Sequence, residues 1–544
     1  MSMVHKARVY AVLPDLSIFV IIFGLFLLLK SFSFHYAVSD ENIYFYDAWL
    51  MYRGEYPYRD FFFAHPPLHL LSGWLMMELQ GGFDFVWMKA LPLFPTLVSA
   101  ILVYRIVYRA SNRIGAVIAL LLLLFSHDLL RASSHWTAVN WAVMWMVGSY
   151  YLLLSRKMLF SGLLLALGIS TALYIVPVAM ILMVMALVDD KKRSRYFFWG
   201  LLFGLLMVNL PFIILAPQGY LNDVFLYHLQ KVTTSSGDFY REAKLLLFHN
   251  FFLFSAPLFA LLLLLRLRTL EEEKGTLRTL LKIDAASPYY IALWSLLLFV
   301  VYLLFLSMLH KVFHYYFIVL FPFGALLGGL FVGRSLDALL RRPQWPYLLL
   351  LSLYLSGGMV IPGYLERGLS YYEKNHDRHL HYEKPVSLLP SQVESTLLAL
   401  LYETERVVGQ DYSTLQYYLW HESRTLVVTD AIVTDIEEHS SHEVTIYGDS
   451  TTVPLIALLA ERAVSANLVD TNYMRFRAEP TLMAQSMKQL LSLSDGWVLI
   501  NPRRGIGKDK VFRHFLAKNY HLVERYPSRY FGTYLLWRKN VPEE

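Results

Sequence analysis

Two neighbouring carboxylates, Asp40 and Glu41, lie just beyond the first long apolar segment of the chain. The amphipathic, aromatic-rich stretch Ile43 to Tyr52 follows them and could lie at the membrane interface. A carboxylate held at a membrane surface beside aromatic faces suits carbohydrate chemistry. It can take a proton from an attacking hydroxyl while the lipid end of a sugar donor stays in the bilayer. Acids and aromatic belts are also common just outside membrane helices, so simple anchoring is the alternative interpretation.

Further polar groups follow in the same segment, namely Asp60, His65 and His69. A Pro-Pro pair directly after His65 favours the start of a short helix over residues 68–79. The two histidines are four residues apart and would share a face if both were helical. With only Asp60 nearby they make a weak metal site, so we expect no metal and no other cofactor.

Basic residues between the apolar blocks could bind a negatively charged group at the membrane surface. The basic candidates between the apolar blocks, with one neighbouring tyrosine, are Arg131, His135, His228, Lys231, His310, Lys311, His314 and Tyr315. The densest group, residues 310–316, fits an interfacial Lys and aromatic anchor equally well. For Arg131 and His135 the anchoring interpretation is the favoured one.

The whole chain has the composition of a membrane protein. Of its 544 residues 56% are hydrophobic and only 17% are charged, whereas about a quarter of a soluble domain is charged. It has no cysteine, which excludes disulfides and thiolate sites. Apolar blocks long enough to cross a ~30 Å hydrocarbon layer continue to about residue 362. They predict about eleven spans. The predicted spans are 14–33, 85–108, 113–128, 137–155, 158–171, 173–188, 196–215, 245–265, 289–309, 312–333 and 344–362.

Basic residues between the blocks set the predicted orientation. The basic segments are the N-terminus, 105–113, 156–157, 191–195, 266–282 and 334–342, and all of them fall on one side. The positive-inside rule makes that side cytoplasmic. The first block has no convincing cleavage site and is interpreted as a retained helix. The stretches 34–84, 129–136, 216–244 and everything after 363 then face outward.

The tail after residue 365 is polar and its pattern alternates between strands and helices, which is typical of a small α/β domain. The expected elements are strands at 444–450 and 497–500, helices at 451–463 and 508–518, and a closing hairpin of 520–526 with 530–538. The predicted domains are therefore a membrane module, 1–364, with the outward loop 34–84, and a soluble extracytoplasmic α/β domain, 365–544.

The outward loop as an ensemble resembles the first outward loop of the GT-C glycosyltransferases. The residues that carry the resemblance are Asp40-Glu41, Tyr44, Ala48, Arg53-Gly54, Tyr56-Pro57-Tyr58, Asp60 and Pro66-Pro67-Leu68. It is most similar to glycosyltransferase family 39 and its relatives, which include the protein O-mannosyltransferases and the bacterial aminoarabinose transferase of lipid A. The resemblance covers roughly residues 10–360. It implies a polytopic helical GT-C fold, a polyprenyl-phosphate sugar donor, Asp40 as catalytic base and Glu41 as its support. The lipid phosphate that leaves such a donor is negatively charged, and the basic candidates above would face it.

One departure from the family affects the substrate. The aminoarabinose transferase has a Glu-Lys pair just before Pro-Pro, where this chain has Ala64-His65. The second acidic contact of that enzyme is therefore missing here, or Asp60 replaces it. The identity of the sugar and of the acceptor stays open for this reason.

The predicted function is the inverting transfer of a sugar to a lipid, glycan or protein acceptor at the outer face of the cytoplasmic membrane, without nucleic acid. The expected substrate-binding residues are Asp60, His65, Arg131, His135, His310, Lys311, His314 and Tyr315. A transporter or flippase of a lipid-linked or envelope component, or a non-catalytic scaffold, is the alternative. A transporter should show repeated halves and mid-membrane charges. The sequence shows no such repeat, and Asn209 is among the few polar residues within a predicted span.

Overall fold

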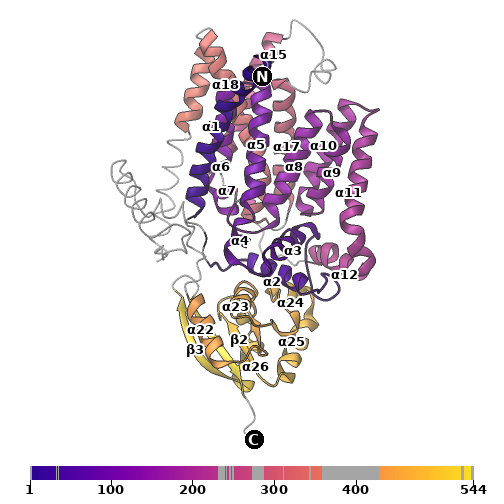
Figure 1. Ribbon diagram of the computed structural model, residues 1–544, viewed down its shortest axis with the longest axis vertical. Coiled ribbons are helices and arrows are strands. Elements are labelled where there is room, and N and C mark those ends of the chain that lie inside the picture. Colours follow the sequence, from indigo (N-terminus) through magenta and orange to yellow (C-terminus); the bar gives the residue numbers. More distant parts are fainter. Residues whose placement is uncertain are drawn as a thin grey trace, which may run out of the picture.

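Up to residue 357 the described part of the chain is mostly helical, and a four-stranded sheet with flanking helices follows from residue 428 (Figure 1). The computed structural model describes residues 3–31, 34, 36–230, 239–240, 242–243, 247, 250–271, 287–309, 312–341, 345–357, 428–528 and 532–540.

Each apolar block that was predicted to span contains a helix. These helices are α1 (Met3–Ser31), α4 (Phe85–Ala90) with α5 (Leu93–Ala110), α6 (Arg113–Leu124), α8 (Ala138–Leu154), α9 (Met158–Ile169), α10 (Val176–Asp189), α11 (Ser194–Leu215), α15 (Phe251–Glu271), α17 (Pro288–Met308), α18 (Phe321–Arg341) and Trp345–Gly357. Among the described residues, 4 helices are long and apolar enough to cross a membrane by length and composition. The count of about eleven spans therefore stays a prediction.

The helices pack where small residues allow their backbones to approach. A Cβ atom on Gly162 of α9 would lie 1.9 Å from the carbonyl oxygen of Phe197 on α11. One on Gly200 of α11 would lie 2.0 Å from the carbonyl oxygen of Leu159. Only glycine fits such contacts, which are typical of membrane helix pairs. Asn209 of α11 is satisfied within the protein, because it bonds to Ser170 at 2.7 Å and to Tyr220 at 2.8 Å. It thus gives no support to a transport pathway.

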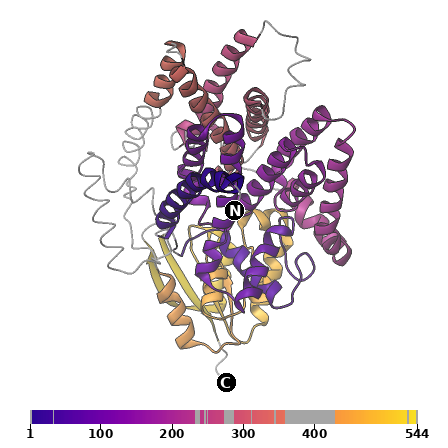
Figure 2. The ribbon, with the colours of Figure 1, turned by 45° about the horizontal axis from the view of Figure 1, so that its top comes forward.

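The short helices α2 (Glu41–Tyr52) and α3 (Leu68–Gln80) lie between the long helices and the C-terminal sheet (Figures 1 and 2). The other short helices are α7 (His127–Ala132), α12 (Pro217–Leu221), η2 (Asn222–Leu226) and α13 (Tyr227–Gln230). The start of α3 at Leu68 confirms the helix predicted after the Pro-Pro pair.

The position of α2 differs from the expectation of an interfacial helix. Phe45 and Leu50 are fully buried, in one apolar cluster with Ile456 of the C-terminal part. This cluster continues through α3 and α4 to Trp136, just before the start of α8. Packing against protein removes these side chains from water just as a membrane surface would. The amphipathic pattern alone therefore could not distinguish burial against the C-terminal part from burial in the membrane surface.

The C-terminal α/β unit, residues 428–540, is built on a sheet of strand order β1-β2-β4-β3. Its elements are α22 (Thr429–His439), β1 (Thr445–Gly448), α23 (Val453–Leu459), η5 (Ser465–Asn467), α24 (Tyr473–Ala478), α25 (Pro480–Ser492), β2 (Gly496–Ile500), η6 (Gly505–Lys508), α26 (Lys510–Asn519), β3 (Tyr520–Ser528) and β4 (Gly532–Lys539). The pair β1 and β2 is parallel, and β4 pairs antiparallel with both β2 and β3. The predicted strands, the helix predicted at 451–463 (α23), α26 and the closing hairpin are confirmed. The helices α22, α24 and α25 were not foreseen.

Both faces of this sheet are covered by helices. On β1, Ile446 belongs to the cluster that includes α22, α23 and α2, while its neighbour Tyr447 belongs to a second cluster with α25 and α26. On β2, Leu499 and Val498 divide in the same way. This alternation follows from the two-residue period of a strand. The apolar cluster on the Ile446 face of the sheet therefore also includes side chains of α2, the helix that begins after Asp40.

Candidate active site

Asp40 stands at the start of α2, where the turn of the helix fixes its position. It is the N-cap residue, and its carbonyl oxygen accepts hydrogen bonds from the backbone of Ile43 at 3.1 Å and of Tyr44 at 3.4 Å. Its side chain makes no capping bond to the helix and is exposed. The carboxylate is therefore presented at the surface of a cleft, and it lines two pockets that meet beside it.

The first of these, the membrane-side pocket, encloses about 740 Å³, part of which is open to solvent. Its lining comes from the start of α2, from α7 and from the segments that lead into α8, α10 and α18. It includes Ser39, Asp40, Tyr44, His65, Asp128, Ala132, His135, Thr137, Ala138, Tyr174, Tyr315, Tyr316 and Ile318. Among the described residues that line it, the basic ones are His65 and His135.

The second, the domain-side pocket, encloses about 610 Å³ and reaches the C-terminal α/β unit. It is lined by Asp40, Ile43, Tyr44, Asp47, Phe62, Phe63, Ala64, His65, Tyr227, Phe313, Tyr315, Tyr316, Asp470 and Asn472. The residues common to both pockets are Asp40, Tyr44, His65, Tyr315 and Tyr316. Two spaces thus meet at one carboxylate and an aromatic wall.

Glu41 lines neither pocket and is only 1% exposed. Its carboxylate accepts hydrogen bonds from Lys89 at 2.8 Å, His135 at 3.0 Å and the backbone of Trp136 at 3.0 Å. Burial alone would raise the pKa of Glu41, but the charges of Lys89 and His135 and their hydrogen bonds lower it below the ordinary value. Glu41 thus ties α2 to α4 and to the turn before α8, a supporting position beside Asp40.

His65 is held at the junction of the pockets by two tyrosines. Its Nε2 atom lies 3.0 Å from the hydroxyl of Tyr44. Its carbonyl oxygen accepts a hydrogen bond of 2.6 Å from Tyr58. Asp60 lies elsewhere, partly exposed and paired with Arg59 at 2.7 Å, and it lines neither pocket. The geometry does not bring Asp60 to the place where it could replace the missing acid.

The basic residues predicted to face the leaving phosphate are only partly within the described residues. His135 and Tyr315 line the membrane-side pocket as expected. The side chains of Arg131 and His314, and the whole of His310 and Lys311, lie outside the described residues. Lys231 does so too, whereas the ring of His228 bonds to the carbonyl oxygen of Ala64 at 2.6 Å.

Several residues of the site were missed by the sequence interpretation. Lys89 and Asp128 lie inside or at the end of predicted spans, and an ionisable residue in an apolar block is a signal of function that could have found them. Asp128 is buried and bonds to Asn250 at 2.6 Å. Asp47 was hidden in the aromatic stretch. Asp470 carries no local signal, because only the fold brings it to the pocket.

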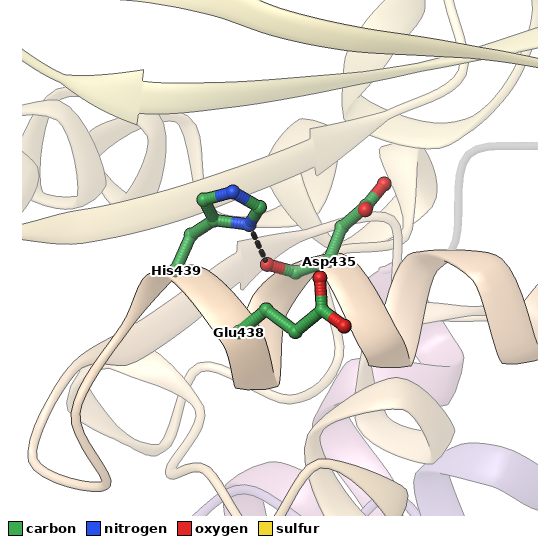
Figure 3. A group of neighbouring side chains, drawn as sticks. All are labelled: Asp435, Glu438 and His439. Carbon is green, nitrogen blue, oxygen red and sulfur yellow. Dashed lines mark hydrogen bonds between the residues drawn. The ribbon is translucent and has the colours of Figure 1, made fainter.

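The described residues offer little for a metal ion. His69 does not share a face with His65, which precedes α3; its ring packs 4.6 Å from Trp136, and burial lowers its pKa to about 3. Asp435, Glu438 and His439 lie close together on α22 (Figure 3). However, Asp435 accepts a hydrogen bond from Tyr526, and the Nδ1 atom of His439 donates to the helix backbone at 2.9 Å. Two of the three potential ligands are therefore already engaged.

Comparison with solved structures identifies the class of fold. No protein-family model and no curated protein matches the chain. The apo structure of ArnT from Cupriavidus metallidurans is similar with a TM-score of 0.63 at 14% identity, over 97% of this chain and 98% of that chain. ArnT is the lipid A aminoarabinose transferase, so the resemblance to the GT-C glycosyltransferases is confirmed at the level of the fold.

Two further structures are similar. ArnT bound to undecaprenyl phosphate has a TM-score of 0.60 at 15% identity, over 95% of this chain and 97% of that chain. The oligosaccharyltransferase of Archaeoglobus fulgidus has a TM-score of 0.49 at 13% identity, over 89% of this chain and 69% of that chain.

Proposed function

We propose that this protein is an inverting glycosyltransferase that moves a sugar from a polyprenyl-phosphate donor to an acceptor hydroxyl, with Asp40 as general base. The observation that carries the proposal is the place of Asp40, where the membrane-side and domain-side pockets meet. Two substrates that react with each other must approach from two sides and touch at one point. A carboxylate at that point can serve as the base.

The donor is assigned to the membrane-side pocket because the segments that lead into the apolar helices α8, α10 and α18 bound it. A lipid tail can then remain in the bilayer while its phosphate and sugar reach Asp40. His65 and His135 line this pocket and can donate hydrogen bonds to the phosphate. The undecaprenyl phosphate bound by ArnT, which has the same fold, supports a lipid phosphate of this kind. The acceptor then enters through the domain-side pocket.

In the reaction, the acceptor oxygen attacks the anomeric carbon from the face opposite the phosphate. Its proton passes to the Asp40 carboxylate, and the bond between the anomeric carbon and the phosphate oxygen breaks. The bonding electrons leave with the polyprenyl phosphate, so the configuration at the anomeric carbon inverts. Phosphate is a good leaving group, so no general acid is needed. With the basic segments cytoplasmic, this site and the C-terminal α/β unit lie at the outer face of the plasma membrane.

Replacing Asp40 by Asn tests the role of the base. We expect the transfer rate to fall by about 10²- to 10⁴-fold, which is the usual contribution of a general base. The readout is mass spectrometry of envelope lipids and glycans from cells with the parent chain, the variant or no chain. Asp60→Asn is the matched control, since this acid of the same loop lies outside both pockets.

Undecaprenyl phosphate binding by the purified variant shows that the protein is still folded. A product that the chain makes at the parental rate with Asn at position 40 would overturn the assignment of the base. If the cells with and without the chain show the same envelope glycans, the transferase proposal itself is wrong.

A further inference from the structure

One face of α2 with its N-cap carries two carboxylates, Asp40 and Asp47, which differ in the pockets that they line. Asp40, Tyr44 and Asp47 are spaced four and three residues apart, which places them on one side of a helix. Asp40 lies at the junction of the pockets, whereas Asp47 lines the domain-side pocket alone. Opposite α2, the C-terminal α/β unit adds Asp470 and Asn472 to the same lining. The domain-side pocket thus holds three aspartates from two distant parts of the chain.

Asp47 has no partner for its charge. It is 1% exposed, and neither of its carboxylate oxygens accepts a hydrogen bond from a described residue. The other buried acids near the site are bonded, Glu41 to Lys89 and Asp128 to Asn250. Buried polar groups are almost always hydrogen-bonded, and a lone buried charge is costly. A buried carboxylate that faces a cavity without a partner therefore indicates a group on the ligand.

The surroundings of Asp47 leave an excess of negative charge. Burial raises its pKa well above the ordinary value and the charge of Asp470 adds to this, while Arg475 opposes it. Arg475 is held beside the pocket rather than in its lining: its guanidinium lies 3.9 Å from the centre of the Phe62 ring and donates to the Asp470 carbonyl oxygen at 3.2 Å. Among the described lining residues of the domain-side pocket there is no Lys or Arg.

We propose that Asp47 and Asp470 bind a positively charged amino group of the acceptor, beside the hydroxyl that Asp40 deprotonates. The aromatic side chains of Phe62, Tyr227 and Phe313 line the same pocket. Such faces suit both the apolar side of a sugar ring and a cation. The acceptor class is therefore an amino sugar with a free amine. The acceptor role of this ligand rests on the proposed transferase function, while its binding does not.

The test measures binding of methyl glucosaminide to the full-length protein in nanodiscs, by isothermal titration, with the N-acetyl and neutral methyl glucoside forms as matched probes. We expect the free amine to bind at least about tenfold more tightly than either probe, as for a desolvated charge pair. Asp47→Asn and Asp470→Asn should each abolish this preference without changing binding of the neutral probe. Glu524→Gln, an exposed acid of β3, should leave the preference unchanged.

Equal binding of the amine and its N-acetyl form, or of parent and both variants, would overturn the proposal and indicate a neutral polyol instead. Should Asp47→Asn fail to fold, as judged by undecaprenyl phosphate binding, Asp470→Asn decides the matter alone. This residue lies in a partly exposed loop, and Asn keeps its side-chain oxygen for the backbone of Asn472. Asp40-dependent transfer without any amine preference would reject this inference and leave the transferase function intact. A preference for the amine without any Asp40-dependent transfer would reject the transferase function and leave the amine site intact.

Discussion

Asp223 is an acid whose pKa the folded structure moves close to neutral pH. It lies in η2, and its carboxylate accepts a hydrogen bond of 3.2 Å from the backbone of Phe63. Burial raises the pKa of Asp223 to about 7, although the Phe63 N–H and the charge of Arg475 favour the ionised form. The folded protein therefore holds this proton more tightly than the unfolded chain, whose Asp titrates near a pKa of about 3.9.

The sign of the pH effect follows from this difference. The contribution of Asp223 to stability is complete below about pH 4 and is lost as the pH rises through about 7. Asp223→Asn cannot ionise and keeps an oxygen for Phe63. The variant should thus gain thermal stability over the parent as the pH rises from 5 to 8, by up to about 3 kcal/mol. Unfolding midpoints in one detergent across this range measure the gain. A constant difference between the two proteins at every pH would contradict the perturbed ionisation.

The sequence predicted more of the residues that line the pockets than of the residues that pair with them. Asp40, His65, His135 and Tyr315 were chosen from their residue type and their place in the segments predicted to face outward, and all four line the membrane-side pocket. Lys89 was counted among the apolar residues of a span, because a local pattern cannot show that a single cation pairs with Glu41 in the interior. Asp470 comes to the pocket only through tertiary packing, which no local pattern records.

At the scale of elements, α2 is fastened to the C-terminal α/β unit at the end that carries the proposed base. The side-chain Nδ2 of Asn42 donates to the carbonyl oxygens of Ala37 at 2.8 Å and Thr451 at 2.7 Å. At the middle of the helix, the hydroxyl of Tyr46 accepts a bond of 2.6 Å from the backbone of Val464. The first contact adjoins Asp40 and the second does not.

Asn42→Ala should therefore lower kcat by at least about tenfold with little change in KM for the donor, because a displaced base costs rate rather than donor binding. Tyr46→Phe is the control: it removes one hydrogen bond, worth about 1 kcal/mol of stability, and leaves kcat near the parental value. Steady-state kinetics and thermal unfolding of both variants make the comparison. Equal losses of kcat in the two variants would mean that the contacts only hold the unit in place.

Helices and strands could be predicted wherever the local repeat of apolar residues determines the type of element. The strands β1 and β2 and the β3–β4 hairpin follow from β-branched and aromatic runs bounded by turn residues, and all were predicted. The cover of α2 was not, because the surface that buries it follows 409 residues after Asn42 in the chain. An apolar helix face predicts that the face is buried, but it does not predict whether protein or membrane buries it.

At the scale of the whole molecule, the orientation of the chain decides whether the site can reach an external acceptor. The N-terminal end of α1 and the C-terminal α/β unit lie at opposite ends of the molecule (Figure 1). The basic segments were predicted to share the side of the N-terminus, and the Asp40 loop packs against the C-terminal α/β unit. The two ends should accordingly face the cytoplasm and the exterior.

Single-cysteine labelling tests this arrangement directly, since the natural chain has no cysteine to remove. Glu524 on β3 and Lys192 between α10 and α11 are both exposed and lie in the regions assigned to opposite sides. In intact cells stripped of any outer membrane, an impermeant maleimide should label Glu524→Cys at once. It should label Lys192→Cys only after the membrane is opened, because the basic segment 191–195 stays on the cytoplasmic side. The reverse pattern would place Asp40 inside the cell, where an external acceptor could not reach it.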